Sequence, residues 1–86
     1  MGDDGRQNPT PEEIDEESRR VRRLRIVVGM ALSIIAQGQV PLEEAQDLVA
    51  ATRRVALELF PGKGDVYDLI YRPKFQQLIR DVYRLQ

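Results

Sequence analysis

The sequence predicts an all-α protein, a small bundle of three to four helices with a long first helix. Apolar residues recur at intervals of three and four residues along most of the chain, the spacing of one face of a helix. Glycine and proline interrupt this pattern at a few places, where we expect the turns. The predicted helices are 11–37, 41–60, 66–71 and 73–85.

The chain of 86 residues has room for one domain. Residues 1–10 are polar and acidic, and we expect a disordered N-terminal tail there, followed by a single helical domain over 11–86. The sequence Thr-Pro-Glu-Glu at 10–13 predicts the start of the first helix, because threonine caps, proline fits the first position and glutamate completes a capping box. Gly38 predicts its end.

Three blocks of different charge follow one another along this first helix. Residues 12–17 are almost all acidic, 19–25 contain five arginines, and 26–36 carry no charge. In the last block the apolar residues spread around more of the helix than one neighbouring helix needs. Either the remaining helices of the chain cover this excess, or another molecule does. The candidate interface residues are Val27, Met30, Ile34, Gly29 and Ser33.

The third helical segment is interrupted by Pro73. Asp65 is the expected N-cap, and Val66, Leu69 and Ile70 share one face. In a continuous helix the apolar residues after Pro73 would lie on the opposite face. Because proline costs about 3 kcal/mol inside a helix, we predict two helices with a bend that turns both faces toward one core.

The composition leaves little for catalysis. The chain has no cysteine and no histidine, so it lacks thiolate ligands, disulfides and the commonest general base. We therefore expect no enzyme activity, no cofactor and no metal. The N-terminus lacks a cationic stretch leading into an apolar one, unlike a signal peptide, and the apolar block is shorter than the about 20 residues that span a bilayer. We expect a soluble cytoplasmic protein of bacterial type without membrane contact.

The arginine cluster has two interpretations. Asp15 precedes Arg19 and Glu16 precedes Arg20 at the i, i+4 spacing, which favours a solvated face with internal ion pairs. The alternative is contact with nucleic-acid phosphates or with an acidic protein. No aromatic residue lies among the arginines, which argues against single-strand binding. The candidate residues for such contacts are Arg19, Arg22, Arg23 and Arg25.

Aromatic and basic residues also occur together near the expected bend. Tyr67, Tyr71 and Arg72 are candidate surface anchors, since tyrosine and arginine are frequent in interfaces. They are equally typical of the edge of a core. With Lys63 they could also line a small anion pocket.

These observations favour a protein–protein interaction or assembly module over other classes. We expect a homodimer formed through the first helix. The alternative is a nucleic-acid-associated protein that uses the arginine cluster at 19–25.

Overall fold

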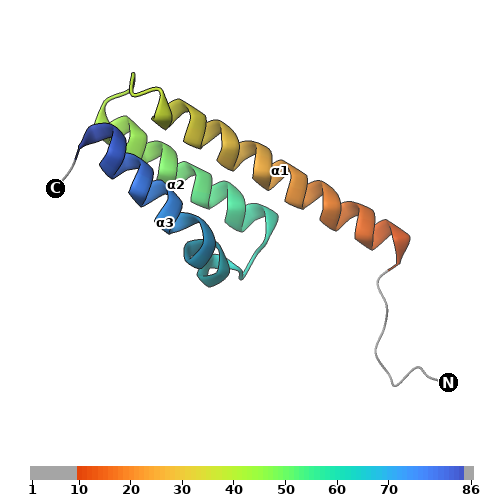
Figure 1. Ribbon diagram of the computed structural model, residues 1–86. Helices are drawn as coiled ribbons and strands as arrows, with labels where there is room; N and C mark the ends of the chain where they lie inside the picture. Colours follow the sequence, from red (N-terminus) through yellow and green to blue (C-terminus); the bar gives the residue numbers. More distant parts are fainter. Residues whose placement is uncertain (1–9, 85–86) are drawn as a thin grey trace.

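Three helices pack side by side in the computed structural model, which describes residues 10–84 (Figure 1). Helix α1 spans Pro11–Ala36, α2 spans Leu42–Leu59 and α3 spans Gly64–Tyr83. Each helix contacts both of the others, and residues 10–84 contain no strand. The all-α class is confirmed, with three helices. The predicted disordered tail lies outside the described residues, except for Thr10.

Both ends of α1 form as the sequence predicts. The backbone N–H of Glu13 donates to the Thr10 hydroxyl at 3.1 Å, and that hydroxyl donates to the Glu13 carboxylate at 3.1 Å. At the other end Gly38 has a positive φ of 67°, a conformation that glycine adopts without steric cost. The helix therefore ends one residue before the predicted limit of 37.

The N-terminal part of α1 extends beyond the bundle. Every residue of 11–20 is exposed, and Figure 1 shows this end of α1 passing the end of α2. With 26 residues against 18, α1 measures about 39 Å and α2 about 27 Å at 1.5 Å per residue. The acidic turns are thus carried on a helical arm, and Ile14 is exposed with them.

The core is one cluster of side chains contributed by all three helices. Alanines at 31, 45 and 56 are buried and let the helix backbones approach, while Phe75 and Ile35 are the largest fully buried side chains. Thr52 is the one buried polar residue within 10–84, and its hydroxyl donates to the Leu48 carbonyl at 2.7 Å. The buried residues are Val28, Ala31, Ile35, Ala45, Thr52, Ala56, Tyr67, Phe75 and Ile79.

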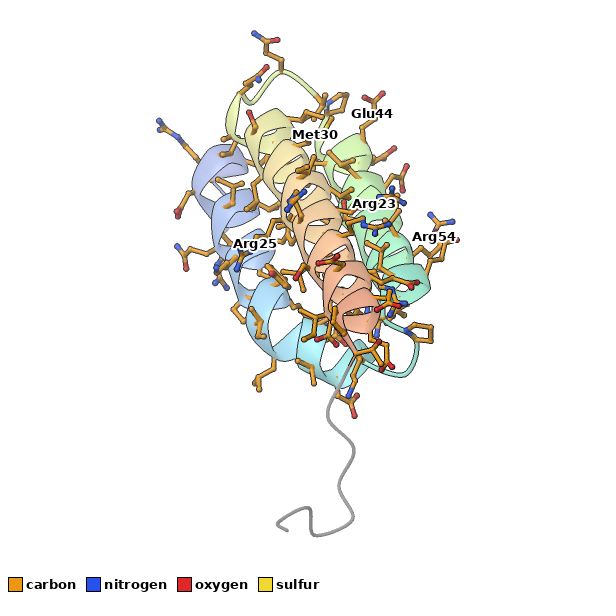
Figure 2. The ribbon with its side chains drawn as sticks, turned by 90° about the vertical axis from the view of Figure 1, so that its right-hand side faces the viewer. Arg23, Arg25, Met30, Glu44 and Arg54 are labelled. Atoms are coloured by element: carbon orange, nitrogen blue, oxygen red, sulfur yellow. The ribbon has the colours of Figure 1, made fainter. Side chains whose placement is uncertain are left out.

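The prediction that the helix breaks at Pro73 is wrong. The segments expected at 66–71 and 73–85 form one helix with Pro73 inside it, and both views show its ribbon bending (Figures 1 and 2). Proline removes the N–H that would bond to the carbonyl of Leu69. Leu69 is 79% exposed, so water reaches this side of the helix. The expected N-cap is also wrong: α3 begins at Gly64, after Lys63, with no side-chain cap bond.

Because the helix is continuous, the exposed apolar residues before Pro73 and the apolar residues after it lie on opposite faces of α3. Tyr67, Phe75 and Ile79 point into the core. Val66, Leu69 and Ile70, which were predicted to turn inward, face solvent. The bend is real, but it does not bring both apolar faces to one core.

Tyr83 connects the end of α3 to the turn between α1 and α2. Its hydroxyl donates to the Val40 carbonyl at 2.6 Å, across 43 positions of sequence. This bond holds the C-terminal end of α3 against the turn that precedes α2.

The register of α3 can be tested with two substitutions. Phe75→Ala should lower the free energy of unfolding by about 3–5 kcal/mol, because a large buried side chain is lost. Leu69→Ala should change it by less than about 0.5 kcal/mol, because that side chain is already exposed. Urea denaturation followed by circular dichroism measures both, and comparable losses at the two positions would contradict the continuous helix.

Candidate functional site

The uncharged block of α1 presents an apolar stripe to solvent. Ile26, Met30 and Ile34 are 55%, 59% and 38% exposed. They follow one another at four-residue intervals, so they lie in one row along the helix. The row is turned away from Val28 and Ile35, which are buried. Figure 2 shows Met30 on the face of α1 that the other two helices leave uncovered.

The predicted interface residues are therefore divided by the fold. Met30, Ile34, Gly29 and Ser33 are exposed, whereas Val27 is half-buried. The excess apolar surface of residues 26–36 is only partly covered by the chain itself.

An apolar groove between α1 and α3 borders this stripe, with a volume of about 860 Å³. Its α1 wall contains Gly29, Ser33 and Ala36, whose small size keeps the groove wide. Lys74 and Asp81 bring charge to the α3 wall. The remaining lining residues are Leu32, Pro73, Gln77 and Leu78.

Gly29 has no role in packing within the described part of the chain. A Cβ atom built at this position meets nothing within 4 Å. Glycine inside a helix is about 1 kcal/mol less favourable than alanine. The residue thus costs helix stability without a gain in the monomer, and it leaves the α1 backbone open to close approach from outside.

A second exposed apolar patch lies on the first half of α3. It consists of Val66, Leu69 and Ile70, all about half exposed or more. The sequence interpretation missed it because it assumed a break at Pro73. The same residues, placed on one continuous helix, would have been assigned to the face opposite Phe75.

The arginines are spread over both flanks of the exposed side of α1 instead of forming one patch. Arg19, Arg22, Arg23 and Arg25 are all exposed, and Figure 2 shows Arg23 and Arg25 on opposite flanks of the helix. The predicted pair of Arg20 with Glu16 is present at 2.7 Å, and this hydrogen bond lowers the pKa of Glu16. The predicted pair of Arg19 with Asp15 is not among the ion pairs of residues 10–84.

The residues near the bend are distributed between core and surface. Tyr67 is buried, Tyr71 is half-buried and Arg72 is exposed. The two tyrosine rings lie 5.2 Å apart, and the Lys74 ammonium is 5.6 Å from the centre of the Tyr71 ring. Burial raises the pKa of Tyr67, whose hydroxyl has no hydrogen-bond partner within the described residues.

The anion pocket predicted at the bend does not form with the expected residues. A cavity of about 350 Å³ includes Tyr67 and Arg72 in its lining, but neither Lys63 nor Tyr71. Asp68 also lines it and binds the Arg53 guanidinium with contacts of 2.8 and 3.0 Å. That hydrogen bonding lowers the pKa of Asp68, so a carboxylate occupies the place where an anion would bind.

Within residues 10–84, no group of three or more acidic side chains is arranged to hold a metal ion. None of the three helices combines the length and hydrophobicity that a bilayer crossing requires.

Comparison with known proteins finds no matching family model, curated protein or solved structure. The surface of the molecule is therefore the basis for any functional conclusion.

Replacing Gly29 tests whether the exposed side of α1 is free of intramolecular contacts. Gly29→Ala should raise the free energy of unfolding of the monomer by about 1 kcal/mol, because alanine favours the helix and its methyl group meets no neighbour. Urea denaturation at low protein concentration measures this. A loss of stability would mean that this part of α1 is packed within the chain.

Proposed function

We propose that this protein is a small, non-catalytic interaction or assembly module that associates with itself through α1. The observation that carries the proposal is the exposed stripe of Ile26, Met30 and Ile34 on a segment without charge. An isolated exposed apolar residue needs no explanation, but a row of them beside an apolar groove is typical of an interaction site.

The small size of the domain supports the same proposal. A domain of about this length buries only about two thirds of its unfolded surface, so its stability is modest unless it associates. Covering the stripe would remove further apolar surface from water, at about 25 cal/mol per Å² before the cost of association.

The proposal predicts that Met30→Glu abolishes self-association without unfolding the chain. Met30 is 59% exposed, so a carboxylate there remains hydrated in the monomer but would be desolvated in an interface. Sedimentation equilibrium across the micromolar range measures the association, and circular dichroism measures the helix content. The matched control is Gln46→Glu, which introduces the same charge on exposed surface of α2 beside α3, away from the apolar stripe.

Two outcomes would contradict the proposal. A wild-type protein that stays monomeric at high micromolar concentration would remove self-association. A Met30→Glu variant that loses its helices would place Met30 in the core of the chain and remove the candidate surface itself.

A second candidate function is nucleic-acid binding, supported by the exposure of Arg19, Arg22, Arg23 and Arg25. Each phosphate contact by an arginine would make affinity fall with added salt. Fluorescence anisotropy with a labelled DNA duplex and a labelled RNA at low salt would detect this. Binding that falls steeply with salt and is lost in Arg22→Gln/Arg25→Gln would support it, and no binding at low salt would exclude it.

A further inference from the structure

We propose that two copies of this chain pair with their α1 helices antiparallel, centred on Met30, with Glu44 of each copy beside Arg23 of the other. This inference rests on the proposed self-association and adds its geometry.

The apolar stripe is symmetric about Met30. Ile26 lies four residues before it and Ile34 four residues after it, both exposed on the same side of α1. In a homodimer with a two-fold axis at Met30, each Met30 contacts its own equivalent, and each Ile26 contacts Ile34 of the second copy. Every exposed apolar side chain of the stripe then meets an apolar partner.

The charge blocks distinguish this arrangement from the parallel one. In a parallel pair in register, the arginines of 19–25 would lie beside their own copies, and so would the acidic residues of 12–17. Both contacts are repulsive. In the antiparallel pair centred on Met30, segment 19–25 faces residues 35–41 of the second copy, which carry no charge. Neither charged block then lies beside its own copy.

The antiparallel arrangement also brings opposite charges together. Glu44 lies in the first turn of α2, beside the C-terminal end of α1, and Arg23 lies two turns before Met30. Figure 2 shows both on the same flank of α1, Glu44 toward one end and Arg23 toward the other. The two-fold axis of this dimer passes beside Met30, perpendicular to α1 and in the plane of the interface. It leaves a side chain on the same flank of the pair and exchanges the two ends of α1. Glu44 of one copy therefore approaches Arg23 of the other, and the pair occurs twice.

Small residues allow the two helices to come close. Gly29 and Ser33 are exposed beside the stripe and line the groove between α1 and α3. A Cβ at Gly29 would meet nothing in its own chain. Bulky side chains of the second copy can therefore lie over this part of α1 without displacing anything.

Disulfide cross-linking tests the orientation directly, because the chain has no cysteine of its own. Met30→Cys should form a disulfide-linked dimer on mild oxidation. Ile26→Cys alone and Ile34→Cys alone should not, because each thiol lies about 12 Å along the axis from its own equivalent. A mixture of the Ile26→Cys and Ile34→Cys variants should give a mixed dimer.

A parallel dimer gives a different pattern, with each of the three variants cross-linking to itself and no preference for the mixed pair. That result would overturn the antiparallel arrangement while leaving self-association intact. A wild-type chain that stays monomeric in sedimentation would instead remove the proposed function, so the two failures are distinguishable.

Charge reversal tests the proposed contact between Glu44 of one copy and Arg23 of the other. Arg23→Glu and Glu44→Arg should each raise the dimer dissociation constant by about tenfold, because the contact occurs twice in a symmetric dimer. The double variant should return to near the wild-type value. The matched control is Arg54→Glu on the side of α2 away from α1 (Figure 2), which should have little effect. Independent losses without recovery in the double variant would overturn the pairing.

Discussion

The structure depends on one packing constraint: within residues 10–84, the two helices that pack against α1 lie on one side of it. The backbones approach through small side chains such as Ala31 and Ala56, and Phe75 fills the space that remains. This arrangement uses Val28 and Ile35 and leaves Met30 outside. The uncharged residues of 26–36 are therefore more than the core of this chain requires, and the exposed stripe of Ile26, Met30 and Ile34 is what remains.

Much of the fold could be predicted from the sequence because its turns are marked locally. The Thr10 cap and Gly38 define the ends of α1 through interactions within a few residues, and such signals survive any tertiary arrangement. The course of α3 could not be predicted in the same way. A local rule places a break at Pro73, but packing of both halves of the helix against α1 and α2 holds it continuous.

The candidate surface on α1 could be predicted only in part. The apolar excess was visible as a pattern, but whether Val27 or Met30 met the rest of the chain depended on the direction from which α2 and α3 approach. The patch of Val66, Leu69 and Ile70 was hidden by the same error that divided α3.

The arm at the start of α1 has a hydrodynamic consequence. Because residues 11–20 are exposed and pass the end of α2, the molecule is longer than a sphere of equal mass. An elongated particle diffuses more slowly than its mass implies, so a single chain would elute from a gel-filtration column ahead of compact standards of equal mass. In an antiparallel pair the two arms point in opposite directions and make the assembly a rod. The apparent mass of such a pair in gel filtration would exceed its true mass by more than that of a single chain does. The size of this difference reports the length of the exposed end of α1.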